Sequence, residues 1–425
     1  MKVMVVGGGG REHALVWKLS QDDSVREIAC CPGNAGIARL AKCLPVRADD
    51  VTGLLSAAFD EGTDLIVFGP EEPLVKGAAD ELRRAGLNVF GPSRQASRIE
   101  GSKVFAKLFM QRHGIPSAAF EVFDEYEKAR AFLSRKDGQV VIKAEGLAKG
   151  KGVAVCDSGP EAQNALREMM VDRQFGRAGS RVVVEERLQG QEVSVMAVCD
   201  GRHHLLLPLS QDHKRALDGD RGPNTGGMGA YCPVPFVGQA LLEEIESAVV
   251  MTALNGMAAE GTPYTGVLYA GIMLTAAGPR VLEFNCRFGD PEAQAVLPSA
   301  DVRLGETLLA AARGELRCGD RVGVRCHSAC VVLASGGYPG EYDTGFDVTG
   351  LETLADEDDV LVFHAGTRDE GGRTVTAGGR VLGVTGTGST LETALGRAYA
   401  AVRAVSFEGM QYRRDIGARA VRVSG

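Results

Sequence analysis

The chain has 425 residues, of which 44% are hydrophobic and 24% charged, and its formal net charge is −8. This length predicts about two to four domains, because one hydrophobic core rarely serves so long a chain, and the composition is that of a folded protein. The negative balance excludes a global basic field, so we expect neither nucleic acid nor a membrane as a partner.

The ten cysteines show no spacing typical of a zinc site or a disulfide scaffold. Cys326 and Cys330 are separated by three residues, and no C-x-x-C motif occurs. Reduced thiols in a cytoplasmic protein fit this usage better. The apolar start MKVMVV runs directly into four glycines, unlike a signal peptide, and no run of about 18 apolar residues predicts a membrane span.

Residues 1–100 alternate short β-rich runs, each closed by Gly or Pro, with helical patterns. Strands are expected at 2–7, 27–33, 64–70 and 87–92, and helices at 12–21 and 74–86. This alternation predicts a doubly wound parallel sheet with helices on both faces, and it places ligands at the carboxyl ends of the strands.

The rest of the chain falls into three further regions. Residues 101–190 predict a helix at 102–114, strands at 139–145 and 151–156 joined by a glycine-rich turn, a helix at 160–171 and a strand at 180–188. Residues 191–325 predict strands at 191–201, 203–210, 265–274 and 279–287 and a long helix at 239–258. Residues 326–425 predict a strand at 328–335, a hairpin at 374–386 and a helix at 390–405. No low-complexity linker separates the regions, so closely packed domains are expected.

The glycine-rich turn GGGGREHA follows the first strand and begins a helix. It does not match the dinucleotide fingerprint G-x-G-x-x-G/A, because the last small residue is missing in both possible registers. Gly9, Gly10 and the helix N-terminus still predict a nest for a single phosphate, with Arg11 as the counter-charge. The alternative is a tight turn that binds nothing.

The stretch VIKAEGLAKGKGV places Lys143 at the end of a strand, before a loop that contains Gly150 and Gly152. Glycines let backbone N–H groups approach phosphate oxygens, and lysines neutralise those oxygens, so a nucleotide phosphate site is predicted. The motif is not a Walker A loop, because G-x-x-x-x-G-K-[ST] is absent. An exposed hairpin with solvated lysines is the alternative.

The strand VVVEERLQGQE ends in Glu185 and Glu186, with Glu192 further along the chain. If it is an edge strand that stops here, it offers unpaired backbone N–H and C=O groups to an adenine ring. The acids are then available to ribose hydroxyls. A charged strand end without a ligand is the alternative.

The stretch VLEFNCRFGDPE interrupts an apolar strand with polar side chains. Side chains alternate along a strand, so Glu283, Asn285 and Arg287 share one face. A carboxylate and an amide oxygen suit Mg²⁺, and Arg287 suits a carboxylate or a transferring phosphoryl group. Asp290 and Glu292 add acids that require cations nearby. The alternative, a direct Glu283–Arg287 ion pair, is disfavoured because four residues of extended strand span more than about 10 Å.

The long polar loop at 210–231 lies between apolar strands, and such loops are usually functional or disordered. Asp212, His213, Lys214 and Asn224 give it charges of both signs, an imidazole and an amide. We therefore predict that this mix of residues contacts a small zwitterionic substrate.

These stretches, together with EGSK, SQDHKR, GPNTGGMGAY, YTGVLYAG and ASGGYPG, resemble the phosphoribosylamine–glycine ligase family of the ATP-grasp superfamily. The resemblance is collinear and covers essentially the whole chain. It implies an α/β and α+β multidomain fold, with an N-terminal domain at 1–100, an ATP-grasp core of two subdomains at 101–190 and 191–325, and a small β-rich C-terminal domain at 326–425. It also implies a ligase of de novo purine biosynthesis, and we expect this ligase to be a monomer.

The resemblance implies a reaction in which ATP, glycine and 5-phosphoribosylamine give ADP, phosphate and glycinamide ribonucleotide through glycyl phosphate. By position it implies that Lys103 and Lys143 hold ATP phosphates, that Glu185, Glu186 and Leu188 line the adenine, that Glu192 binds ribose, and that Glu283 and Asn285 bind Mg²⁺ or Mn²⁺. Lys143 and Arg287 are expected to act in catalysis by neutralising negative charge.

The sequence departs from the family in two places. Relatives often carry Asn at the position of Gly8, so a contact to phosphoribosylamine is expected to be missing there. The strand GVLYAGIML lacks the metal-binding acid of many ATP-grasp enzymes, so only two protein ligands are expected.

Two other functions stay open at this point. The nucleotide motifs alone would allow an ATP-grasp ligase for another carboxylate, although RFGDPE and GPNTGGMGAY argue against it because they are specific to the family. A non-catalytic nucleotide-binding protein is the second alternative. The presence of Glu283, Asn285 and Arg287 argues against that one.

Overall fold

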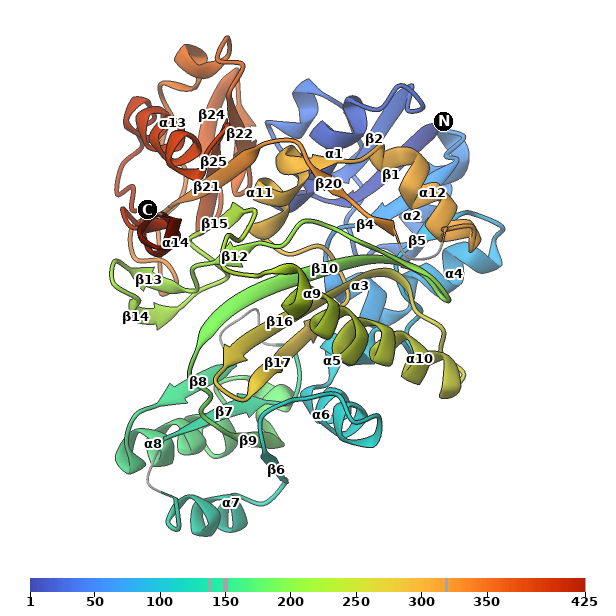
Figure 1. Ribbon diagram of the computed structural model, residues 1–425. Coiled ribbons are helices and arrows are strands. Elements are labelled where there is room, and N and C mark those ends of the chain that lie inside the picture. The colour runs from blue at the N-terminus through green and yellow to red at the C-terminus, as the bar shows by residue number, and fades with distance from the viewer. Residues whose placement is uncertain (137–138, 148–151, 318–319, 425) are drawn as a thin grey trace.

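The N-terminal lobe is the predicted parallel sheet, and it appears in blue in Figure 1. In this computed structural model, residues 1–136, 139–147, 152–317 and 320–424 are described. The sheet consists of β1 (Lys2–Gly7), β2 (Glu27–Pro32), β3 (Lys42–Cys43), β4 (Leu65–Phe68) and β5 (Val89–Phe90), in the order β3-β2-β1-β4-β5, and its pairings are parallel.

Helices α1 (Gly10–Ser20), α2 (Val51–Asp60), α3 (Glu71–Lys76) and α4 (Ala78–Arg84) accompany this sheet. The single helix predicted at 74–86 is wrong, because Gly77 adopts a φ of 97° and separates α3 from α4. A left-handed glycine satisfies the last carbonyl groups of one helix and redirects the chain. Strand β3 was not predicted, since its two residues carry no periodic pattern.

The second lobe is a four-stranded antiparallel sheet of β6 (Phe120–Phe123), β9 (Val182–Glu186), β7 (Val140–Ala144) and β8 (Val153–Cys156), in that order. On one face, Ile142 and Val184 join a hydrophobic cluster with α7 (Tyr126–Leu133) and α8 (Gly159–Met170). Alternation along the strands turns Lys143 and Glu185 to the other face. The edge strand predicted at Glu185 is wrong, because β9 lies between β6 and β7.

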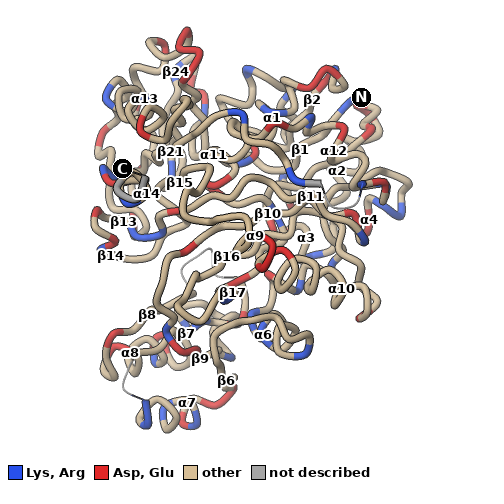
Figure 2. Tube along the Cα trace, in the orientation of Figure 1, with Lys and Arg blue, Asp and Glu red and all other residues tan. Residues whose placement is uncertain are grey.

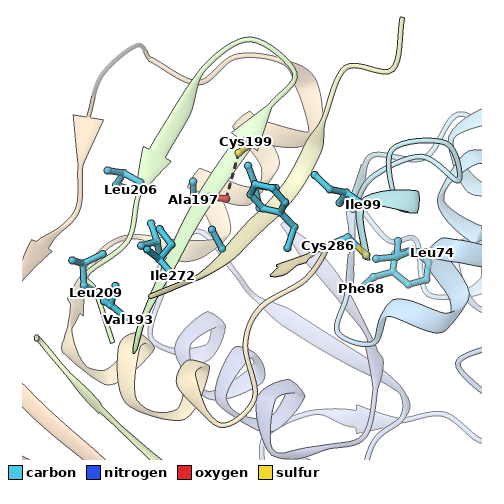
Figure 3. Packing of buried hydrophobic residues seen from close by; sticks show 14 of the residues in the cluster. Phe68, Leu74, Ile99, Val193, Ala197, Cys199, Leu206, Leu209, Ile272 and Cys286 are labelled. Atoms are coloured by element: carbon cyan, nitrogen blue, oxygen red, sulfur yellow. Dashed lines mark hydrogen bonds between the residues drawn. The ribbon is translucent and has the colours of Figure 1, made fainter. Parts of the chain in front are cut away.

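The central sheet follows the order β17-β16-β10-β11-β19. Its strands are β17 (Gly278–Asn285), β16 (Thr265–Thr275), β10 (Gln191–Asp200), β11 (His204–Leu206) and β19 (Asp320–Arg321). The predicted long helix is confirmed as α9 (Gln239–Ile245), a π-helical segment at Glu246–Met251 and α10 (Thr252–Ala259). Figure 3 shows a single hydrophobic cluster in which Val193 and Ile272 of this sheet accompany Phe68 and Leu74 of the N-terminal lobe.

The C-terminal sheet draws strands from both sides of the boundary predicted at 326. Its order is β12-β15-β21-β25-β22, formed by β12 (Gln211–Asp212), β15 (Gly229–Cys232), β21 (His327–Ala334), β25 (Arg380–Gly388) and β22 (Val360–His364). The hairpin predicted at 374–386 is wrong: β24 (Arg373–Thr376) pairs with β23 (Thr367–Glu370), whereas β25 pairs with β21 and β22. The domain boundaries stay predictions.

The remaining elements lie between or beside the sheets. They are α5 (Arg98–Gly101), α6 (Lys103–Arg112), the ribbon β13 (Arg215–Leu217) and β14 (Arg221–Asn224), α11 (Glu292–Ser299), β18 (Ala300–Asp301), α12 (Leu304–Arg313), β20 (Gly323–Val324), α13 (Leu391–Ala404), α14 (Ala418–Ser424) and short 3₁₀ turns at 37–39, 176–179 and 351–354. Figure 2 shows acidic and basic residues interspersed over all the lobes. Within the described ranges, no helix has the length and apolar character needed to cross a membrane.

Candidate functional site

One pocket gathers most of the predicted site residues. It has a volume of about 480 Å³ and is bordered by the four-stranded sheet, β17 and the loops that follow β17. The predicted residues that line it are Arg11, Lys103, Lys143, Gly152, Glu185, Asp212, Lys214, Asn224, Glu283, Asn285, Arg287, Asp290 and Glu292. Its described lining does not include Gly9, Gly10, Glu186, Leu188 or Glu192, and Gly150 lies outside the described residues.

At one end of the pocket, two lysines share a buried carboxylate. Lys143 Nζ lies 3.0 Å from Glu185 Oε1 and donates to the Leu282 carbonyl oxygen at 2.8 Å. Lys107 Nζ lies 2.9 Å from Glu185 Oε2, and burial lowers the pKa of Lys107 to about 8 although Glu185 raises it. One carboxylate thus faces two ammonium groups, and the positive surplus suits a polyphosphate.

Lys103 adds a third ammonium group at this end. Ser102 caps α6 by accepting a hydrogen bond from Phe105 N at 3.1 Å, which fixes the position where Lys103 leaves the backbone. Lys103 Nζ donates to the Gly146 carbonyl oxygen at 3.2 Å, and burial lowers the pKa of this lysine.

Strand β17 brings Glu283 and Asn285 to the pocket, as predicted, but it is not a regular strand. A bulge places Glu283 opposite Gly271 and Val281 opposite Ile272, so Leu282 is the extra residue in this register. The Leu282 carbonyl oxygen is the one that accepts from Lys143. The bulge therefore connects the central sheet to the lysine-rich end.

The charges around Glu283 favour its anionic form. Burial raises the pKa of the Glu283 carboxyl, but Lys214, Lys143 and further cations outweigh burial and lower that pKa to about 2. With the Asn285 amide, the carboxylate offers two hard oxygen ligands that fit Mg²⁺ or Mn²⁺. No group of three or more His, Cys, Asp and Glu is arranged to hold a metal in the described parts of the chain. A cation here would therefore take its other ligands from phosphate and water.

Arg287 contacts acids other than Glu283. Its Nη2 lies 3.0 Å from Glu100 Oε1 and its Nε 3.4 Å from Glu71 Oε2. Burial lowers the pKa of Arg287, but Glu100 and Glu71 raise it by more, so the guanidinium stays charged. The Arg287 guanidinium thus lies at the pocket wall, as predicted, and it pairs there with two carboxylates that were not predicted from the sequence.

The opposite end of the pocket is acidic. Lys214 Nζ lies 3.1 Å from Glu192 Oε2 and 3.7 Å from Glu283 Oε1. Burial raises the pKa of Asp212 to about 8, with Lys214 acting against the shift and Glu292 adding to it. Glu292 accepts a hydrogen bond from the Tyr269 hydroxyl at 2.7 Å. Such an excess of carboxylates suits an ammonium group or a metal cation.

An arginine from the C-terminal lobe holds Asp290. Arg380 begins β25, and its Nη2 lies 2.8 Å from Asp290 Oδ2. Its Nη1 donates at 2.8 Å to the carbonyl oxygens of both Asp290 and Gly226. Burial raises the pKa of the Asp290 carboxyl, but Arg380 and Arg11 lower it by more. The loops that carry Gly226 and Asp290 are thus joined by one guanidinium.

The glycine turn after β1 contains an anion of its own. The buried Glu12 carboxylate accepts from Gly9 N at 2.5 Å and pairs with Arg11 Nε at 2.7 Å. The nest predicted for a phosphate is therefore partly filled by Glu12, although Arg11 still lines the pocket. A Cβ atom at Gly8 would lie 2.4 Å from the Gly33 carbonyl oxygen, so this backbone does not accept a larger residue there.

The residues predicted for adenine and ribose follow β9. Glu186 is exposed and accepts from Ala119 N at 3.1 Å, and Leu188 is half-buried. Glu192 pairs with Lys214 next to the pocket. Their ligand roles stay predictions.

Five lining residues with ionisable side chains were not predicted from the sequence: Lys107, Glu71, Glu100, Tyr269 and Arg380. Lys107 stands one helical turn after Lys103, and that spacing could have placed both on one face of α6. Glu71 directly follows a parallel strand, where ligand contacts are common. Arg380 carries no local signal, because its partner Asp290 is 90 residues away in the chain.

Family models match nearly the whole chain. The N domain of phosphoribosylglycinamide synthetase matches residues 1–100, its ATP-grasp (A) domain matches residues 101–293, and its C domain matches residues 328–419. A phosphoribosylamine–glycine ligase of Caulobacter vibrioides is 48% identical over 424 residues, which are 99% of each chain. The trifunctional purine biosynthetic protein adenosine-3 of Homo sapiens is 47% identical over 424 residues, which are 99% of this chain and 42% of that protein.

Solved structures agree with this match. The phosphoribosylamine–glycine ligase from Thermotoga maritima has a TM-score of 0.84 and 37% identity, and the alignment covers 98% of this chain and 100% of that one. A biotin carboxylase from Campylobacter jejuni has a TM-score of 0.74 at 13% identity, covering 97% of this chain and 92% of that one. The second likeness concerns the fold alone.

Proposed function

The chain belongs to the phosphoribosylglycinamide synthetase family, and we propose how its pocket performs the reaction of that family. The protein is an ATP-grasp carbon–nitrogen ligase of purine biosynthesis that joins glycine to 5-phosphoribosylamine. The observation that carries the proposal is one pocket with a lysine-rich end and an acidic end, and with Glu283 influenced by the lysines of both.

We assign the lysine-rich end to ATP. Lys103 and Lys143 would bind the phosphates, and Lys107 would remain beside Glu185. Glu283 and Asn285 would hold Mg²⁺ or Mn²⁺, which when bound neutralises charge on the phosphate oxygens. We assign the adenine to Glu185, Glu186 and Leu188, with backbone groups of Gly152 near the phosphates. We assign the ribose to Glu192, whose carboxylate also pairs with Lys214 of the acidic end.

We assign the acidic end and its loops to the other two substrates. Asp212, Lys214 and Asn224 would hold glycine, whose ammonium group meets the carboxylates. Phosphoribosylamine would lie toward the N-terminal lobe, near Arg11 and the glycine turn.

The reaction has two steps in this arrangement. A glycine carboxylate oxygen attacks the γ-phosphorus of ATP, the bond to ADP breaks, and glycyl phosphate forms. The amine nitrogen of phosphoribosylamine then attacks the acyl carbon, phosphate leaves, and the nitrogen loses a proton. Lys143 and Arg287 neutralise the developing negative charge.

The test is ADP release from ATP and Mg²⁺, with and without glycine and freshly prepared phosphoribosylamine. Alanine and serine serve as competing acids. ADP that forms only with glycine and phosphoribosylamine together supports the assignment. Turnover with another acid would keep the ATP-grasp chemistry and replace the substrate. ATP binding without turnover on any acid would favour a nucleotide-binding protein.

A further inference from the structure

The ribbon β13–β14 is seen beside the C-terminus in Figure 1. A pocket residue lies at each of the two ends where the ribbon joins the rest of the chain. Lys214 directly precedes β13, Asn224 ends β14, and both line the pocket. Thr225 joins these two ends of the ribbon, because its N and Oγ1 donate to the Lys214 carbonyl oxygen at 2.7 and 2.9 Å. A tilt of the ribbon would therefore move both pocket residues.

The ribbon has little hydrophobic support of its own. Its strands contain three and four residues, and the Leu217 side chain is 53% exposed. A short two-stranded ribbon is only marginally stable alone in water. Its orientation must therefore come from contacts with another part of the molecule.

Arg413, close to the C-terminus, supplies those contacts. It is 1% exposed and ranks among the largest fully buried side chains. Its Nη1 donates to the Arg215 carbonyl oxygen at 3.1 Å and lies 2.8 Å from Asp220 Oδ1 in the ribbon turn. Its Nε and Nη2 donate to the two Asp415 carboxylate oxygens, each at 2.8 Å. One guanidinium thus contacts the first strand, the turn and its own segment.

Residues close to Arg413 add four contacts with the same region, and in one of them Arg419 Nη2 contacts Asp220 Oδ2. Asp415 Oδ2 accepts from Gly219 N at 2.8 Å. Arg414 N donates to Asp218 Oδ1 at 2.8 Å, and Gly417 N donates to His213 Nε2 at 3.2 Å. His213 lies between two predicted substrate residues, so the C-terminal segment contacts both the tip and the base of the ribbon.

We propose that Arg413 is a positioning residue for the amino-acid substrate. By holding the ribbon through Asp220 and Asp415, it sets the places of Lys214 and Asn224 in the pocket. The inference rests on the proposed function, which assigns this end of the pocket to glycine. A buried guanidinium paired on both sides resists displacement, because separating it from either carboxylate leaves an uncompensated charge.

Asp220→Asn is the main test variant: it removes the carboxylate that Arg413 shares with Arg419, and it leaves Arg413 its Asp415 partner. We expect KM for glycine to rise roughly 10- to 100-fold, the scale of a misplaced binding group, while KM for ATP stays within about twofold. Asp220→Glu keeps the carboxylate and should recover most of the loss. The matched control is Arg373→Met, which breaks an exposed ion pair of 2.9 Å with Asp347 on the same lobe and should leave both KM values unchanged.

Amide hydrogen exchange of residues 215–224 provides a readout that needs no substrate. Faster exchange in Asp220→Asn, together with the selective rise in KM for glycine, supports the proposal. Unchanged exchange, or faster exchange with an unchanged KM for glycine, would overturn it, and so would equal rises in both KM values. If the wild-type enzyme turns over only with another acid, the glycine assignment fails, and the same comparison of KM values for that acid decides the role of Arg413.

Discussion

The two ends of the pocket are built in opposite ways. The charges of the lysine-rich end stand on regular elements: Lys143 on β7, Glu185 on β9, and Lys103 and Lys107 on α6. At the acidic end, Glu192 and Glu292 also stand on regular elements, β10 and α11, but Asp212 lies on a two-residue strand and Lys214 and Asp290 lie in loops. The arginines that hold these loops are distant in sequence: Arg380 is 90 residues from Asp290, and Arg413 is 198 residues from Arg215. A charge on a helix or strand is placed by local structure, whereas a charge on a loop needs contacts from distant parts of the chain.

The ends also differ in the sign of their surplus charge. Two lysines face Glu185 at one end and Lys103 adds a third ammonium group there, while carboxylates outnumber cations around Lys214 at the other end. A polyphosphate and an ammonium group require these opposite surroundings. Glu283 responds to both, since Lys143 and Lys214 each lower the pKa of its carboxyl.

The largest effect on the contrast between the two ends is expected from Arg287, because its guanidinium is a cation that lies among carboxylates. Arg287→Ala is expected to lower kcat of glycine-dependent ADP release roughly 10²- to 10³-fold, the scale of removing one charge-stabilising donor. The substitution also leaves the buried Glu100 unpaired, so the melting temperature should fall.

The double variant Arg287→Met with Glu100→Gln separates these two effects. It removes both charges of the buried pair, so the melting temperature should recover while kcat stays low. Recovery of kcat to within tenfold of the wild type would make Arg287 a structural residue.

Glu283→Gln comes next in expected size. It removes the anionic ligand between the two ends, and the Mg²⁺ concentration for half-maximal activity should rise roughly 10- to 100-fold. Binding of ATP in the absence of divalent cation is the internal control and should not weaken, because the lysines remain. An unchanged Mg²⁺ requirement would place the cation on other residues.

The same contrast explains what the sequence could predict. Period-two alternation placed Glu283 and Asn285 on one face and Lys143 at a strand end, because those features are local. Alternation does not say which strand lies beside which, so the interior position of β9 and the separation of β24 from β25 were missed. Arg380 and Arg413 were missed because each acts on a partner far away in sequence.

The pH dependence of glycine binding tests the acidic end more finely. Since burial raises the pKa of Asp212 to about 8, its carboxyl is mostly protonated at pH 7 and ionised at pH 9. If this carboxylate binds the glycine ammonium group, KM for glycine should fall about tenfold from pH 7 to pH 9, because the ionised fraction of Asp212 rises about tenfold over this range. Asp212→Asn should give a high KM with little pH dependence over this range. The same slope in the variant would exclude Asp212 as its origin.

Lys107 tests the lysine-rich end, where the expected effect is smallest. Lys143 can turn from Glu185 to a phosphate only if Glu185, which is 3% exposed, keeps another cation, and Lys107 is that cation. Lys107→Met should therefore weaken ATP binding by about 1 kcal/mol, or roughly fivefold in KM. Lys107→Arg should bind ATP better than the Met variant.

Lys18→Met is the matched control: burial also lowers the pKa of Lys18 to about 8, but this lysine contacts the Ala300 carbonyl oxygen away from the pocket. Both Met variants should lose stability, and only Lys107→Met should raise KM for ATP. Equal KM values for ATP in the two variants would mean that Lys107 is not needed for Lys143 to move from Glu185 to a phosphate, or that Lys143 never leaves Glu185.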